Sequence, residues 1–113
     1  MIILVVVRDE DVRGLIGLML SAFDVLVAAD EDEALAIASS VEVDLLLTEL
    51  GLPTDEEARS VDGRSLAGRL GSPALYITSW FDHPDFIRLD GERIVKEPFS
   101  RDDLMRAIDA VGS

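Results

Sequence analysis

The sequence predicts an α/β fold, in which helices cover both faces of a parallel β-sheet. Short runs of Val, Leu and Ile alternate with segments whose apolar residues recur at helical spacing. The runs are apolar on both faces, as is typical of strands buried between two layers of helices. The chain has 113 residues, the size of one ordinary domain, so we expect a single core.

The first half of the chain contains three predicted strands and two predicted helices. Uninterrupted β-branched and aliphatic residues indicate strands at 2–7, 25–28 and 43–48. Between them, apolar residues spaced three and four apart predict a helix over 12–23 and a shorter one over 30–40. Each strand is therefore followed by a helix, as parallel pairing requires.

The second half continues this alternation with longer polar interruptions. The strand runs are shorter here, and the last helix presents three apolar residues to the core. We predict a surface loop at 54–63, a helix at 64–70, a strand at 74–78, an irregular segment at 80–92, a strand at 93–95 and a helix at 100–111.

Three predicted helix ends carry residues with a clear local role. Asp30 with Glu33, and Ser100 with Asp103, have the spacing of a capping box, in which two side chains satisfy free backbone N–H groups. Gly71 follows a predicted helix and is suited to the left-handed conformation of a C-cap. These signals support the predicted boundaries.

This order of elements leaves few topologies, because crossovers between parallel strands are right-handed. A single domain with five such strands best fits a flavodoxin-like three-layer sandwich with strand order 2-1-3-4-5. Function in this class lies at the carboxyl ends of the strands. Those ends carry residues 7–9, Glu49, 78–79 and 96–97.

Composition excludes several classes of function. The chain has 10 Lys and Arg against 23 Asp and Glu, and its net charge of −13 repels nucleic acid and anionic membranes. There is no Cys, and the single His83 cannot form a site of several histidines. The apolar start lacks a basic region and a cleavage site, and no apolar stretch approaches the roughly 20 residues that span a bilayer. We expect a soluble, cytoplasmic domain.

Four segments, in order, resemble those of response-regulator receiver domains of two-component signalling. They are ILVVVRDEDVRGLI, DLLLTELGLP, YITS and VKEPFSRDDLMRAI, and together the resemblance covers nearly the whole chain. The short stretch after Thr78 also resembles single-domain receivers with a shortened fourth helix. The resemblance implies a receiver-like domain over residues 1–113 with no output domain.

The metal-binding side of the receiver site is changed in this sequence. In the family, two adjacent acidic residues and an acceptor aspartate bind magnesium, which prefers oxygen ligands. The resemblance places the acidic pair at Val7 and Arg8, with Asp9 adjacent, and the acceptor at Glu49. A shifted alignment instead makes Asp9 and Glu10 the pair. Glu49 is either a mimic of the phosphorylated acceptor or a salt-bridged carboxylate in a decayed site.

The phosphoryl-binding side is also changed. The conserved Thr or Ser of the family is retained as Thr78, but the position of its Lys is Glu97, with Lys96 one place early. The aromatic switch position is Ile94, and the resemblance implies a cis bond before Pro98. Because the charges at Arg8 and Glu97 are opposite to those of the family, we predict that Arg8 pairs with Glu49 or Glu97 and neutralises the site.

These departures predict an atypical, degenerate receiver that is not an enzyme and needs no cofactor. It would act in a two-component phosphorelay by binding a histidine kinase, a phosphotransfer protein or another regulator, and the resemblance also allows a homodimer. The alternative is a receiver phosphorylated on a non-standard carboxylate, Glu49 or Asp9, with magnesium. We expect no partner among nucleic acids or membranes.

Overall fold

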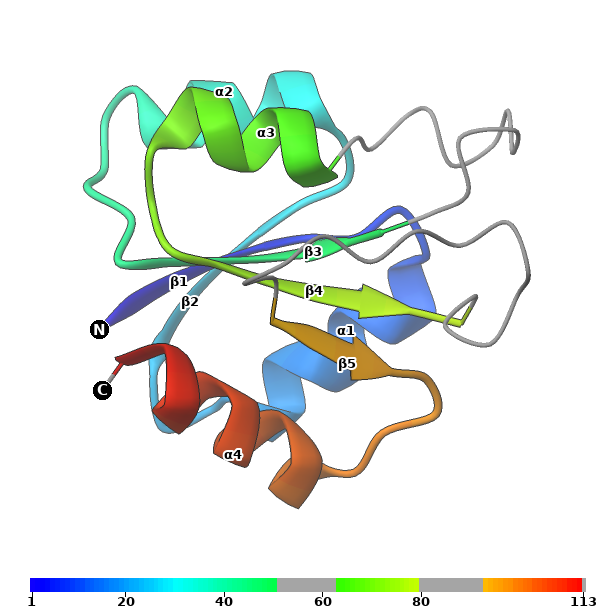
Figure 1. The fold of residues 1–113 in the computed structure, drawn as a ribbon. Helices are drawn as coiled ribbons and strands as arrows, with labels where there is room; N and C mark the ends of the chain where they lie inside the picture. The colour runs from blue at the N-terminus through cyan, green and yellow to red at the C-terminus, as the bar shows by residue number, and fades with distance from the viewer. Residues whose placement is uncertain (51–62, 80–92, 113) are drawn as a thin grey trace.

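The computed structural model describes residues 1–50, 63–79 and 93–112, which form a parallel sheet with helices on both faces (Figure 1). The five strands have the order β2-β1-β3-β4-β5, so the predicted fold class and strand order are confirmed. The strands are β1 (Ile2–Val6), β2 (Asp24–Ala28), β3 (Leu45–Glu49), β4 (Ala74–Thr78) and β5 (Ile94–Lys96). The predicted surface loop, except for its last residue Gly63, lies outside the described residues. So does the predicted irregular segment 80–92, where the resemblance implies a shortened fourth helix.

Four helices are described, two on each side of the sheet. Figure 1 shows α1 and α4 below the sheet and α2 and α3 above it. The helices are α1 (Glu10–Met19), α2 (Glu31–Ala38), α3 (Gly63–Leu70) and α4 (Arg101–Gly112). Among the described residues, no helix is long and apolar enough to cross a membrane.

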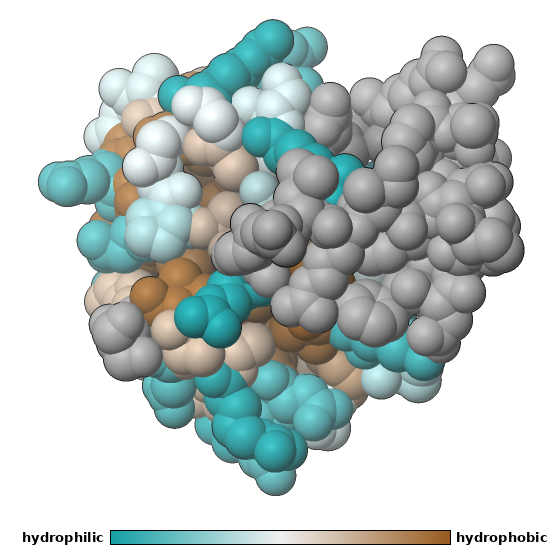
Figure 2. Space-filling view, viewed as in Figure 1, coloured by the Kyte–Doolittle hydropathy of each residue, from teal (hydrophilic) through white to brown (hydrophobic). Residues whose placement is uncertain are grey.

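Side chains that alternate along the strands fill two separate cores. Ile3 and Val5 of β1 pack with the buried residues of α1 and α4. Leu4 and Val6 point the other way and pack with those of α2 and α3. This alternation explains why the strands are apolar at every position. In the space-filling view, hydrophilic residues cover the outer sides of the helices, and apolar residues show at the level of the sheet (Figure 2).

The predicted boundaries of four strands are wrong by one or two residues. β1 ends at Val6 rather than at Val7, and β2 begins at Asp24 rather than at Val25. β3 begins at Leu45 rather than at Val43. Asp44 lies before the strand, and its Oδ2 accepts a hydrogen bond of 2.8 Å from the N–H of Ile2. β5 covers Ile94–Lys96, one residue later than predicted.

The three predicted helix ends that carry capping residues are confirmed, whereas α1 ends at Met19 rather than at Phe23. The N–H of Glu33 donates to Asp30 Oδ1 over 2.8 Å, and Gly71 has a φ of +67°. At α4 the exchange is reciprocal: Asp103 N–H donates to Ser100 Oγ over 3.1 Å, and Ser100 N–H donates to Asp103 Oδ2 over 3.0 Å. The hydrogen bond from the Ser100 backbone lowers the pKa of Asp103, as expected for a capping carboxylate.

Candidate functional site

The sheet brings the predicted site residues to one edge. In the register of the parallel strands, Val6 lies opposite Thr48, and Thr78 lies opposite Lys96. The carboxyl ends of β1, β3, β4 and β5 therefore meet at the right-hand edge of the sheet in Figure 1. The chain that continues from each end carries the side chains that the sequence singles out.

Glu49 is tied to the end of β1 by a backbone hydrogen bond. Its half-buried carboxylate accepts the N–H of Arg8 at Oε1 over 2.5 Å. The predicted ion pair is not found: within the described part of the chain, the exposed guanidinium of Arg8 pairs with neither Glu49 nor Glu97. The carboxylate at the acceptor position is thus held by a donor that every non-proline residue offers.

The two positions beside Arg8 have other roles. Val7 is 1% exposed and belongs to the core formed with α1 and α4. Asp9 is the N-cap of α1, where its Oδ1 accepts the N–H groups of Asp11 and Val12 over 2.9 and 3.2 Å. This cap starts α1 at Glu10, two residues earlier than the apolar pattern predicts.

Glu97 completes a group of carboxylates at this edge. Its backbone N–H donates to the carbonyl of Thr78 over 2.8 Å, which continues the pairing of β4 and β5 by one residue. The pKa of Glu97 is raised, first because the side chain is partly buried and then because the charges of Glu49 and Asp9 repel its anion. Lys96, in contrast, is exposed. Among the described residues, the charges that act on Glu97 are those of the anions Glu49 and Asp9, not that of the neutralising arginine predicted from the sequence.

Comparison with known proteins is informative only at the level of structure. No protein-family model matches the chain, and no curated protein matches it. Among similar solved structures is the receiver domain of the hybrid histidine kinase CckA, with 24% identity, all of both chains covered and a TM-score of 0.75. The receiver domain of the PhyR response regulator of Erythrobacter litoralis has 16% identity, with 96% of this chain and 87% of that chain covered, and a TM-score of 0.76.

A third similar structure is the chemotaxis protein CheY4 of Vibrio cholerae. It has 19% identity, a TM-score of 0.72 and coverage of 97% of both chains. The chain has the response-regulator receiver fold. Because identity is low throughout, the similarity shows the fold, and the chemistry of the site has to be judged from the residues present.

The residues present do not fit the magnesium ion of the receiver fold. The side chain of Val7 has no atom that could bind a metal ion. The Glu49 carboxylate accepts the Arg8 N–H, and the Asp9 carboxylate caps α1. In residues 1–50, 63–79 and 93–112, no three Asp, Glu or His side chains are placed to hold a metal ion. The shifted alignment with Asp9 and Glu10 as the acidic pair gains no support from this arrangement.

The remaining receiver positions keep their places in the fold. Thr78 is 3% exposed at the end of β4, and Ile94 is half-buried opposite Tyr76. The peptide bond between Glu97 and Pro98 is cis.

Gly63 has a role that the sequence did not reveal. We predicted it as the last residue of the surface loop 54–63, but it is the first residue of α3 and is buried against the end of β3. A Cβ at this position would lie 2.4 Å from the carbonyl oxygen of Glu49 and 2.8 Å from Thr48 Cγ2. Only glycine allows α3 to approach the acceptor position this closely. An unexpected polar residue, Thr48, is fully buried beside it, and its Oγ1 donates to the Val6 carbonyl over 3.1 Å.

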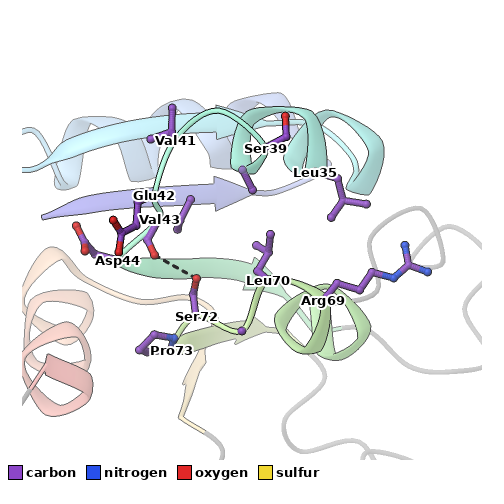
Figure 3. Close-up of a pocket in the computed structure, with 12 residues that line it drawn as sticks. Leu35, Ser39, Val41, Glu42, Val43, Asp44, Arg69, Leu70, Ser72 and Pro73 are labelled. Atoms are coloured by element: carbon purple, nitrogen blue, oxygen red, sulfur yellow. Dashed lines mark hydrogen bonds between the residues drawn. The ribbon is translucent and has the colours of Figure 1, made fainter.

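Two grooves lie at opposite ends of the sheet. An apolar groove of about 390 Å³ adjoins the carboxylates and runs between α1 and the turn after β5. A larger groove of about 660 Å³ lies at the amino ends of β3 and β4, where Ser72 Oγ donates to the Val43 carbonyl over 3.1 Å (Figure 3). In Figure 3 the Arg69 side chain points away from Glu42 and Asp44. The apolar groove adjoins the predicted site, and so does a groove of about 600 Å³ between β5 and α4 whose lining includes Ile94, Lys96 and Glu97.

Proposed function

We propose that this chain is an atypical receiver that acts in two-component signalling by binding a partner protein, without magnesium-dependent phosphorylation. The observation that carries the proposal is the hydrogen bond from the Arg8 N–H to Glu49. It occupies one oxygen of the only carboxylate at the acceptor position. The second support is Val7, whose burial leaves the metal-binding side of the site without a ligand.

Electrostatics also oppose the transfer of a phosphoryl group to this site. Phosphoryl transfer depends on cations that neutralise the charge of the incoming group. Here Glu97 stands at the position of the family's lysine, and Glu49 and Asp9 raise its pKa. A phosphoryl group on Glu49 would replace the single charge of its carboxylate by roughly two, and so add about one negative charge to this group of carboxylates.

The surface next to the site supports protein binding. On α1, Leu15 is 50% exposed and Leu18 is 76% exposed, which is unusual for two large apolar residues on one helix face. The partner class is a signalling protein: a histidine kinase, a phosphotransfer protein or another regulator. Because the hydrogen bond from the Arg8 N–H holds Glu49 without phosphorylation, such a partner would meet the same surface whether or not a phosphodonor is present.

The test is incubation with radiolabelled acetyl phosphate and magnesium. We expect no label on the protein. As the matched control, the quadruple variant Val7→Asp, Arg8→Asp, Glu49→Asp and Glu97→Lys restores the family's residues and should incorporate base-labile label. Base-labile label on the unsubstituted protein, lost in Glu49→Gln or in Asp9→Asn, would overturn the proposal in favour of a non-standard acceptor.

A further inference from the structure

β2 is an edge strand of the described sheet, because it pairs with β1 on one side only. At its start, the N–H of Asp24 donates to the Met1 carbonyl over 3.2 Å. At its end, the carbonyl of Ala28 accepts the Val7 N–H over 3.2 Å. The first and last residues of β2 therefore turn their backbone polar groups toward β1.

Val25 and Val27 turn their backbone polar groups the other way, to the free edge of the sheet. Successive residues of a strand direct their N–H and C=O groups to alternate sides, and both ends of β2 face β1. In residues 1–50, 63–79 and 93–112, the N–H and C=O groups of Val25 and Val27 have no backbone partner. The Val27 side chain is also 44% exposed. The edge thus offers hydrogen bonds and apolar surface at the same place.

The edge of β2 carries none of the features that usually keep another strand away. Such edges are commonly protected by a Lys, a Pro or a β-bulge. The strand has the sequence DVLVA, without Lys or Pro, and all five of its residues pair with β1 in unbroken register. A second strand could therefore pair along the whole of β2.

Carboxylates at both ends of β2 identify the chemistry of the strand that would pair with it. Asp24 is exposed at the start of the strand. Beyond its end, Asp30 caps α2, and the first turn of that helix adds Asp32 and Glu33, all three exposed. An incoming strand with positive side chains at its two ends is attracted at both places, whereas an acidic one is repelled.

We propose that an extended segment of a partner protein adds to the edge of β2 as a sixth strand, with apolar residues at its centre and a Lys or Arg at each end. Its backbone pairs with the free N–H and C=O groups of Val25 and Val27, and an apolar side chain packs beside Val27. This inference goes beyond the proposed function, because β1 separates β2 from β3 and strand addition does not depend on the state of Glu49.

A second copy of the chain fits this edge less well than a basic partner segment. Two copies of β2 that pair in antiparallel fashion would bring Asp24 of one copy toward the acidic first turn of α2 in the other. Each copy also carries a net charge of −13, so the long-range repulsion acts in the same direction.

The test begins with selection from a displayed library of random linear peptides, in buffer without magnesium or phosphodonor. We expect the selected peptides to share alternating apolar residues between Lys or Arg residues. Hydrogen exchange of the isotope-labelled protein then locates the bound peptide. At saturation, the amides of Val25 and Val27 should exchange at least about tenfold more slowly, because they gain hydrogen-bond acceptors, whereas the amide of Leu26, which already faces β1, should change less.

One substitution removes the free donor and leaves the pairing of β1 and β2 in place. Val27→Pro deletes an N–H that points out of the sheet, and proline is tolerated at such edge positions. We expect the affinity for the selected peptides to fall at least about tenfold, as for the loss of a hydrogen bond together with a steric block. The control Val27→Thr keeps the N–H and the β-branched shape, so it should change the affinity by less than about threefold.

A second pair of variants tests the charges. The double variant Asp24→Asn and Asp32→Asn should weaken binding about tenfold, and this loss should shrink as salt is added. Asp109→Asn is the control, because it removes an exposed charge from α4, which packs against β4 and β5, and it should leave the affinity unchanged.

Several outcomes would overturn the proposal. They are the absence of any selected peptide, a consensus without basic residues, and bound peptides that do not slow the exchange of Val25 and Val27. Self-association that protects these two amides would assign the edge to a second copy of the chain instead. The exchange measurement uses the unsubstituted protein, so the test stands even if Val27→Pro does not fold.

The two proposals fail in different ways. Label from acetyl phosphate would refute the absence of phosphorylation and leave strand addition at β2 untouched. Unchanged exchange at Val25 and Val27, with no label incorporated, would refute strand addition alone.

Discussion

Both ends of β3 carry a carboxylate that accepts a backbone N–H from β1 or its continuation, yet the two carboxylates lie in different surroundings. At the start of β3, the exposed Asp44 accepts the Ile2 N–H over 2.8 Å. At its end, the half-buried Glu49 accepts the Arg8 N–H and faces Glu97. The first bond joins the two strands at an exposed carboxylate. The second joins the same strands while it holds one of several mutually repelling carboxylates.

The comparison teaches that one kind of bond occurs in two surroundings, exposed at one end of β3 and among carboxylates at the other. Asp44 lies where receivers have no reacting group, so its hydrogen bond only fixes the register of β1 and β3. Glu49 lies at the predicted acceptor position, and under the proposed function the same bond there holds one of its two carboxylate oxygens. The predictions below test whether the two ends differ in this way.

The largest effect is expected at the contact between α3 and the end of β3. Gly63→Ala would place a Cβ 2.4 Å from the Glu49 carbonyl oxygen, so backbone must move. We expect the free energy of unfolding to fall by about 1–3 kcal/mol in urea titrations. Gly14→Ala is the control, because its Cβ meets open space, and it should be neutral or stabilising by up to about 1 kcal/mol. Equal losses in the two variants would contradict the tight contact.

A second pair of variants compares the two carboxylates directly. Asp44→Asn keeps an acceptor for the Ile2 N–H but removes the charge, so it should lose about 0.5–1 kcal/mol of stability. Glu49→Gln also keeps an acceptor, for the Arg8 N–H, and in addition relieves the repulsion with Glu97, so it should lose less or gain. Urea unfolding at pH 7 measures both. A larger loss at Glu49 than at Asp44 would remove the distinction between the two ends.

A smaller effect is expected from the titration of Glu97. Because its pKa in the folded protein is raised above 4.5, the ordinary value of a Glu side chain, its ionisation destabilises the fold as the pH rises through the folded pKa. Glu97→Gln should therefore raise the melting temperature at pH 7, and this gain should vanish below about pH 4.5. Glu97→Lys should gain somewhat more, up to about 1 kcal/mol, by pairing with Glu49. A gain that is constant from pH 4 to pH 8 would mean that repulsion is not its cause.

The fold could be predicted because its signals are local and repeated. Alternating apolar runs and helical spacing gave the strand order, and capping residues such as Asp30 and Ser100 marked helix ends. The start of β3 was misplaced because Val43 continues the apolar run. In the structure Asp44 lies before the strand, and its carboxylate accepts a hydrogen bond from the N–H of Ile2 on the neighbouring strand. That contact spans distant parts of the chain, and a local pattern contains no sign of it.

The site could be located from the sequence, but its bonding could not. Resemblance placed Glu49 and Glu97 at the ends of two strands of one sheet edge, and in the structure the charge of Glu49 contributes to the raised pKa of Glu97. The partner of Glu49 was expected to be the guanidinium of Arg8 and is its backbone N–H, a donor present at almost every position and therefore invisible in a sequence. The packing of Gly63 against Glu49 was missed for a similar reason, since a glycine in a polar segment is typical of a turn.

The most direct test follows the amide resonance of Arg8 in the isotope-labelled protein during titration with magnesium, and then with magnesium and beryllofluoride. We predict that the resonance stays in place in both titrations, while the quadruple variant that restores the family's residues responds to both. A saturable shift of the Arg8 amide in the unsubstituted protein would mean that Glu49 releases its backbone donor to bind the metal and the phosphoryl mimic, and the proposed absence of phosphorylation would be wrong.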